Sequence, residues 1–246
     1  MPACHRVRAV SGMTLHDAVL LAAGGSRRLG RPKQLLMREG EPLVRRAARL
    51  ALATAPRRLL VVTGGAGDAV AAALDGLVWQ RVHHAGWATG LAGSLRAAGD
   101  VLGADASPSV LLVGCDQPAL ASAHLHALLA GSAAVSSGCA ATRHAEARLA
   151  ARVGIPAVVP ADWLRGGSRP MTTGRAPMAQ AGPGGAAARD NGSHPDRGLG
   201  QRLRALPPAS LWMLDAPDLR CDIDTRDDMR AAIARGWLDA DATVED

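Results

Sequence analysis

The sequence predicts an α/β protein in which two helical layers enclose a mostly parallel sheet, forming a three-layer sandwich. Three short runs, at 19–23, 59–63 and 110–113, are almost entirely apolar, as parallel strands covered on both faces need to be. Amphipathic stretches with helical spacing separate these runs. This alternation of strand and helix is typical of parallel strands that are joined by crossover helices.

The other elements follow from the same contrast between strand and helix periods. In the first half of the chain we expect helices at 42–55, 68–77, 91–102 and 121–130. In the less regular second half we expect strands at 133–142, 148–159, 210–214 and 219–223, and a helix at 197–206. A final helix is expected at 225–235, capped by Thr225, because a threonine hydroxyl can accept from an unpaired N–H of the first turn.

The chain is expected to form one domain at 18–246, preceded by an N-terminal extension at 1–17. Residues 165–198 contain no Leu, Ile, Val or Trp. Such a segment cannot bury enough apolar area to offset the entropy lost on ordering. We therefore predict a flexible insertion at 165–197 within the domain.

Composition and charge exclude several classes of protein. The net charge of +6 would suit a nucleic-acid ligand, but the Arg residues are scattered among acidic ones, and no Phe or Tyr is available to stack bases. No apolar run is long enough to cross a membrane, and residues 1–17 lack the apolar stretch of a secretory signal. The four widely spaced cysteines indicate neither a zinc site nor a disulfide framework. We expect a cytoplasmic protein that binds neither nucleic acid nor membrane.

The most distinctive stretch is a glycine-rich, cationic loop directly after the first predicted strand. Lys33, which ends it, is the only lysine among the 28 Lys and Arg residues, and this suggests a role for a compact ammonium group. The backbone N–H groups of such a loop can receive an anion at the carboxyl end of a sheet. The spacing fits neither the Walker nor the dinucleotide pattern, and a simple tight turn would not require the whole set. The candidate nucleotide-binding residues of this stretch are Leu21, Ala22, Ala23, Gly24, Gly25, Ser26, Gly30 and Lys33, with Arg28 as a further cation.

A second candidate site follows the predicted strand at 110–113. Its carboxylate, Asp116, would lie at the same edge of the sheet as the glycine-rich loop. Mg²⁺ binds proteins through one or two carboxylates together with substrate phosphates, so Asp116 is the candidate metal ligand. Asp222 and Asp224 are weaker candidates for a second carboxylate. The alternative for Asp116 is that it only caps the helix that follows Pro118.

Several motifs together point to a known family. The stretch L-A-A-G-G-S-R-R-L-G-R-P-K at 21–33 resembles the signature loop L-A-A-G-x-S-x-R-x-G-x-x-K of the molybdopterin nucleotidyltransferases. Further segments resemble later family motifs in the same order: G-L-A-G-S-L at 90–95, G-C-D-Q-P at 114–118, G-I-P-A at 154–157, D-R-G at 196–198 and D-I-D-T-R-D-D at 222–228. The resemblance covers the chain from about residue 18 to residue 233. Ala22-Ala23-Gly24 resembles the cytidylyl-transferring branch, whereas Cys115 before Asp116 is a variant shared with the guanylyl-transferring branch.

The resemblance implies a Rossmann-like fold of the nucleotidyltransferase type. The implied reaction transfers CMP from CTP to the molybdenum-bound pterin cofactor, with Mg²⁺ as cofactor and release of pyrophosphate. Arg28, Lys33 and Asp116 would be its catalytic residues, and Gly90 and Ser94 would also bind the nucleotide. A molybdoenzyme of the xanthine dehydrogenase class would be a further partner. Two alternatives stay open: nucleotidyl transfer to a sugar phosphate or another small phosphate, and a non-catalytic chaperone that delivers the molybdenum cofactor.

The remaining conspicuous residues favour structural roles. The histidines within 83–84 and 124–126 lack a third partner at metal-ligand spacing, so they are expected at the surface or bonded internally. Residues 144–146 are expected to form a polar turn. Trp87 is expected to anchor the core or a loop, although its closeness to Gly90 would also allow it to line a substrate pocket.

Overall fold

The structure, a computed structural model, describes residues 15–146, 149–165 and 197–240. Two sequence predictions therefore lie wholly or largely outside the described residues. These are the N-terminal extension up to residue 14 and the insertion between residues 166 and 196. Among the described residues, no helix is long and apolar enough to cross a membrane.

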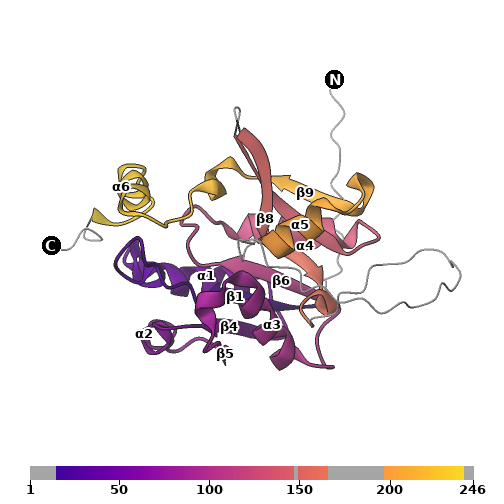
Figure 1. Cartoon of the computed structure of the whole chain (residues 1–246), viewed down its shortest axis with the longest axis horizontal. Helices are drawn as coiled ribbons and strands as arrows, with labels where there is room; N and C mark the ends of the chain where they lie inside the picture. Colours follow the sequence, from indigo (N-terminus) through magenta and orange to yellow (C-terminus); the bar gives the residue numbers. More distant parts are fainter. Residues whose placement is uncertain (1–14, 147–148, 166–196, 241–246) are drawn as a thin grey trace, which may run out of the picture.

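The described part of the chain centres on one seven-stranded sheet (Figure 1). Its strands are β1 (His16–Ala22), β4 (Leu59–Thr63), β5 (Gln80–His83), β6 (Ser109–Gly114), β7 (Cys139–Glu146), β8 (Leu149–Pro160) and β9 (Leu211–Asp215). The strand order is β5-β4-β1-β6-β8-β7-β9. Every neighbouring pair is parallel except the two pairs that include β8. All the other strands therefore end at one edge of the sheet, which confirms the predicted, mostly parallel arrangement.

Helices cover both faces of the sheet and complete the three layers (Figure 1). One face carries α1 (Leu43–Leu52), α2 (Gly67–Ala73) and α4 (Ser122–Ala133), and the other carries α3 (Leu91–Leu102) and α5 (Arg197–Arg204). Neighbouring residues of a central strand point to opposite faces, so Val19 and Leu20 lie in different hydrophobic clusters. Burial on both faces is the reason that these strands are continuously apolar.

The last helix, α6 (Arg226–Ala234), packs apart from both helical layers (Figure 1). Thr225 Oγ1 accepts from the backbone N–H of Asp228, and the Asp228 carboxylate accepts from the N–H of Thr225 at 2.8 Å. This capping box confirms the predicted start of the helix. The buried face of α6 joins a small hydrophobic cluster with Leu29 and Leu36, so the C-terminal segment supports the glycine-rich loop from behind.

A short hairpin lies between that loop and α1. It consists of β2 (Met37–Arg38) and β3 (Glu41–Pro42), which pair antiparallel. The carboxylate of Asp239 accepts from the backbone N–H groups of Glu39 and Gly40, at 2.7 and 2.9 Å. The end of the described chain is thus tied to the segment that follows the glycine-rich loop.

The first strand begins at His16, so two residues assigned by sequence to the extension belong to the sheet. The side chain of Asp17 is fully buried and accepts from Ser107 N at 2.7 Å and from the guanidinium groups of Arg57 and Arg58. Burial acts to raise the pKa of Asp17. The hydrogen bonds from Arg58 and Ser107 and the charges of both arginines outweigh it, so this pKa lies below its ordinary value.

Most elements predicted from the sequence are present. The strand at 59–63 and the helix at 91–102 match residue for residue. The strand predicted at 219–223 is wrong: the chain makes a 3-10 turn at Pro217–Arg220 instead. Leu219 and Ile223 are apolar because each anchors a different hydrophobic cluster, not because they share a strand.

Three further differences concern strand ends and edges. The strand predicted from residue 133 starts at Cys139, because the preceding residues finish α4 and form a turn. Residues 144–146 are the end of β7 and not a polar turn. Sequence analysis missed β5, because this edge strand buries only Val82 and so shows no apolar run.

Candidate active site

The glycine-rich loop leaves the carboxyl end of β1 and folds back on itself. The N–H groups of Leu29 and Gly30 both donate to Ser26 O at 3.0 Å, and Ser26 and Gly30 adopt left-handed backbone angles, with φ of 45° and 79°. The hydroxyl of Ser26 accepts from Lys33 N at 3.0 Å. These bonds bring the far end of the loop, with Lys33, back to the edge of the sheet.

Gln34, a residue that sequence analysis missed, fixes the start of the same loop. Its side chain is buried, and Nε2 donates to Ala22 O at 2.8 Å and to Gly24 O at 2.7 Å. A Cβ added to Gly24 would lie 3.7 Å from Lys33 Cε. The loop backbone therefore packs closely over the lysine side chain. The only signal in the sequence was the position of Gln34 directly after Lys33.

The ammonium of Lys33 lies between two carboxylates. Its Nζ is 2.6 Å from Asp116 Oδ2 and 2.8 Å from Asp224 Oδ1. Burial acts to lower the pKa of Lys33, but the two carboxylates outweigh it and raise the pKa above its ordinary value. Arg28 Nη2 lies 2.8 Å from the other oxygen of Asp224. Burial acts to raise the pKa of Asp224, whereas Lys33 and Arg28 lower it overall.

Asp116 takes its place from the sheet and not from a helix. It follows β6, whose residue Gly114 pairs with Leu21 of β1, so both site loops leave neighbouring strands at the carboxyl edge. The capping alternative is wrong, because α4 begins at Ser122 with Ala121 as its N-cap and no side-chain cap. The backbone of Asp116 also accepts from Ile223 N at 3.2 Å, which holds the C-terminal carboxylate segment beside it.

Asp222 is held beside Asp116 by Gln117. Gln117 Nε2 donates to Asp222 Oδ1 at 3.1 Å, to Leu219 O at 3.1 Å and to Ile155 O at 3.2 Å. Burial, followed by the charge of Asp116, raises the pKa of Asp222 to about 7. Two carboxylates thus share a space in which the second does not ionise readily, because burial and a neighbouring like charge both disfavour its charged form.

These groups line one cleft of about 650 Å³. Nine of the predicted site residues are on its wall: Leu21, Ala23, Gly24, Lys33, Gly90, Ser94, Asp116, Asp222 and Asp224. The remaining predicted residues, Ala22, Gly25, Ser26, Arg28 and Gly30, shape the loop or pair with Asp224 without lining the cleft. The wall also includes Trp87 and four cationic or titratable side chains from the second half of the chain that sequence analysis missed: His144, Arg152, Arg204 and Arg220.

The histidines at 124 and 126 have the predicted structural roles, whereas His84 does not, because its Nε2 is buried without a hydrogen-bond partner among the described residues. His124 Nε2 shares a hydrogen bond of 2.8 Å with Thr142 Oγ1, and burial, followed by the charge of His144, lowers the pKa of His124 to about 4. His126 is exposed. Within the described residues, no three His, Cys, Asp or Glu side chains gather closely enough to hold a metal by themselves. A cation at this edge would therefore need ligands from a bound substrate as well.

Comparisons with known proteins agree with this geometry. A model of the MobA-like NTP transferase domain family matches residues 18–209. A comparison with curated protein sequences finds no significant match. Among solved structures, Rv0371c from Mycobacterium tuberculosis H37Rv is 26% identical, with a TM-score of 0.61, over 90% of this chain and 99% of that chain.

Two more distant structures share the fold. A nucleotidyl transferase from Methanothermobacter thermautotroptrophicus is 22% identical, with a TM-score of 0.62, over 90% of this chain and 97% of that chain. The 2-C-methyl-D-erythritol 4-phosphate cytidylyltransferase from Thermus thermophilus is 18% identical, with a TM-score of 0.55, over 91% of this chain and 100% of that chain. The mostly parallel sheet with flanking helices is thus a nucleotidyltransferase-type fold.

Proposed function

This chain belongs to the MobA-like NTP transferase family, and on that premise we propose that it transfers CMP from CTP to the molybdenum-bound pterin cofactor. A phosphate oxygen of the acceptor attacks the α-phosphorus of CTP. The bond from that phosphorus to the bridging β-phosphate oxygen breaks, and pyrophosphate leaves with the electron pair. One phosphoanhydride bond forms as another breaks and no oxidation state changes, so no redox partner is needed.

One observation carries the proposal: the single lysine of the chain lies between two carboxylates, beneath a glycine-rich loop, inside the cleft. Catalysis of nucleotidyl transfer consists mostly of positioning and charge neutralisation. Lys33 holds the triphosphate and stabilises the charge that develops on the leaving pyrophosphate. Arg28, which is largely exposed, contacts the triphosphate from the solvent side. The backbone of 23–26 receives phosphate oxygens.

The carboxylates fit a magnesium ion. Asp116 and Asp222 face a common space, and the raised pKa of Asp222 reflects burial beside the charge of Asp116. Gln117 adds a neutral oxygen, since its Oε1 is buried without a partner among the described residues. Asp116 and Asp222 would hold Mg²⁺ together with phosphate oxygens, and Asp224, already paired with Lys33 and Arg28, would hold the two cations in place. The ion would supply charge neutralisation on the triphosphate.

CTP is the proposed donor because Ala22-Ala23-Gly24 resembles the cytidylyl-transferring branch. The wall of the cleft also carries Arg152, Arg204 and Arg220, side chains suited to an acceptor that bears phosphate. A sugar phosphate would satisfy the same cations, and this is the second candidate acceptor. A chaperone that binds the cofactor without reacting is the non-enzymatic alternative.

Pyrophosphate release separates these possibilities. The purified protein is mixed with Mg²⁺ and CTP, GTP, ATP or UTP, with the molybdenum-bound pterin cofactor, with a panel of sugar phosphates, or with no acceptor. Release that requires both CTP and the pterin supports the proposal. Release with a sugar phosphate alone moves the function to the second candidate. Tight pterin binding without release under any condition identifies a chaperone and refutes the proposed reaction.

A further inference from the structure

The indole of Trp87 is wedged between two loops at the carboxyl edge of the sheet. A Cβ added to Gly25, in the glycine-rich loop, would lie 2.2 Å from Trp87 Cζ3. A Cβ added to Gly64 or Gly65, which follow β4, would lie 2.8 Å from Cγ or 3.2 Å from Cζ2. Glycine at these three positions therefore lets the flat ring lie directly against backbone. Its position is fixed before any ligand arrives.

The ring is also next to the predicted phosphate site. Gly25 directly follows Gly24, which packs over Lys33. Trp87 begins the 3-10 turn that leads to Gly90 and α3, and it lines the same cleft as Lys33 and Ser94. No other Trp, Phe or Tyr of the described chain lines this cleft.

Arg27 makes the only cation–π contact to this indole among the described residues. The guanidinium of Arg27 lies 5.7 Å from the ring centroid, and Arg27 itself is exposed. A cation over an aromatic ring at this distance is a weak contact at an exposed site. A planar group of a ligand could displace it and gain a larger stacking area on a ring that is already held rigid.

We propose that Trp87 is the stacking platform for the base of the nucleoside triphosphate whose phosphates lie at Lys33, and that Arg27 covers this platform in the free protein. The inference rests on the proposed function, because it needs a nucleotide at this site. The inference assigns each part of the nucleotide to its own contacts: the glycine-rich loop and Lys33 bind the phosphates, and the ring of Trp87 binds the base. Stacking tolerates any base, so Trp87 supplies affinity for the nucleotide without selecting among bases.

Comparing CTP with inorganic tripolyphosphate tests this division by calorimetry with Mg²⁺. Tripolyphosphate has the charges of CTP but no base. Trp87→Leu should weaken CTP binding about tenfold, the scale of losing one base–aromatic stack, and leave tripolyphosphate affinity within about twofold of wild type. Trp87→Phe should lie between wild type and Leu for CTP. Equal weakening for both ligands, or no weakening for either, would overturn the proposal, because Trp87 would then only support the loop or play no part.

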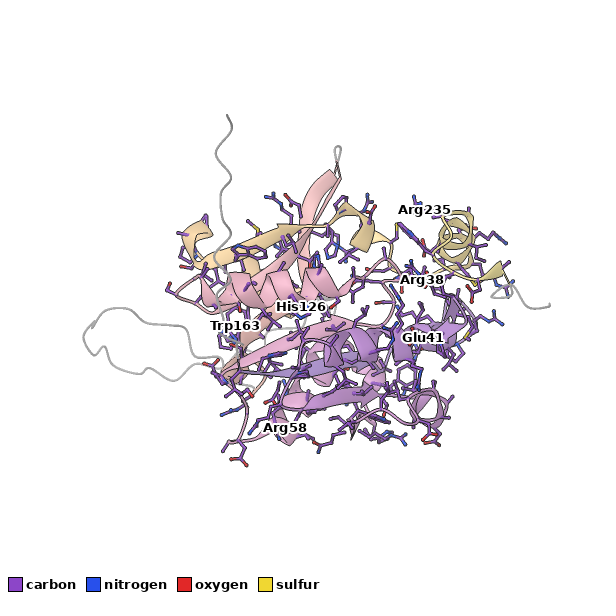
Figure 2. All side chains as sticks on the ribbon, turned by 180° about the vertical axis from the view of Figure 1, so that it is seen from behind. Arg38, Glu41, Arg58, His126, Trp163 and Arg235 are labelled. Atoms are coloured by element: carbon purple, nitrogen blue, oxygen red, sulfur yellow. The ribbon has the colours of Figure 1, made fainter. Side chains whose placement is uncertain are left out.

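Trp163 provides a matched control for this test. Trp163, which is labelled in Figure 2, is also covered by a guanidinium, that of Arg202 at 4.1 Å. It does not line the cleft. Trp163→Leu should leave CTP affinity unchanged.

Tryptophan fluorescence gives a second measurement. In the wild type, CTP but not tripolyphosphate should quench tryptophan emission, and Trp87→Phe should abolish this quench, whether or not the Leu variant folds. A quench that survives in Trp87→Phe contradicts the platform. A wild type that binds neither ligand refutes the proposed function itself, whereas a wild type that binds both with no role for Trp87 refutes only the platform.

Discussion

Replacing Lys33 by Met gives the sharpest test of the proposed site. Met keeps an unbranched apolar stem of similar length, so the packing under the loop is largely retained while the ammonium is lost. The lost group contacts Asp116 at 2.6 Å and Asp224 at 2.8 Å in a side chain that is only 13% exposed. Removing one preorganised charge from a transition state typically costs about 10²- to 10³-fold in turnover. We expect a loss of kcat on this scale.

The expected effect on stability is much smaller. The two carboxylates remain in contact with water, with side-chain exposures of 23% and 42%, so solvent can replace the ammonium. We expect the free energy of unfolding to fall by about 1 kcal/mol, the upper end of the range for exposed pairs. For a chain of this size that corresponds to a decrease of roughly 2–4 °C in the melting temperature. The large loss of kcat and the small loss of melting temperature should therefore be easy to tell apart.

The assay measures pyrophosphate release from CTP with the pterin acceptor, beside a melting curve for each variant. Arg49→Met is the matched control, since Arg49 makes a comparable pair with Glu41 at 2.9 Å on the surface of α1, outside the cleft. It should retain full turnover. Lys33→Arg should recover only part of the activity, because a planar guanidinium cannot place one charge between two carboxylates as an ammonium does.

A fully active Lys33→Arg variant would show that any cation suffices, and would contradict the inference that the site requires the compact ammonium group of a lysine. Full turnover in Lys33→Met would remove Lys33 from the reaction altogether. A Met variant that is inactive only because it fails to fold would appear in the melting curve as a loss far beyond the expected few degrees, and this would refute the stability reasoning.

Three further predictions concern other parts of the molecule. Asp116→Asn should sharply weaken Mg²⁺-dependent CTP binding in calorimetry with little change in melting temperature; equal binding would exclude Asp116 as a metal ligand. Gly99→Ala should lower the free energy of unfolding by about 1–3 kcal/mol in urea titrations, despite the better helix propensity of Ala, because the new Cβ would lie 2.4 Å from Leu164 O. Gly198→Ala, where a Cβ meets nothing within 4 Å, should be neutral or stabilising, and the same loss in both would contradict the clash. The pKa of Asp17 is lowered from 3.8, so its ionised form stabilises the fold above about pH 4, and this stabilisation is lost as pH falls through the lower folded pKa. The difference in unfolding free energy between wild type and Asp17→Asn, measured by urea titration at a series of pH values, should therefore shrink in acid. A difference that stays constant with pH would refute the assignment.

The sequence by itself determined three central strands of the sheet and the location of the two site loops. The apolar runs at 19–23, 59–63 and 110–113 predict strands because parallel strands covered on both faces are mostly apolar along their whole length. Their carboxyl ends must then lie at one edge, so Lys33 and Asp116 could be assigned to a common site from local pattern alone. The cap at Thr225 was equally local, since a hydroxyl and a carboxylate three residues apart satisfy each other's backbone.

Tertiary structure decided the features that depend on long-range neighbours. The edge strand β5 has no apolar run because only one of its faces is covered, and the apolar residues at 219 and 223 serve two clusters rather than one strand. Which carboxylate meets which cation was likewise beyond the sequence: Arg28 and Asp224 are separated by 196 positions.

The same holds for the groups that sequence reasoning did not assign to the site. Gln34 and Gln117 orient the loop and Asp222 through single amide groups, and the three arginines of the cleft wall come from β8, α5 and the turn before Asp222. Hydrophobic periodicity reports only whether a side chain is buried. Charge pairing and the shape of a cleft depend on which distant side chains meet, and only the folded chain brings those together.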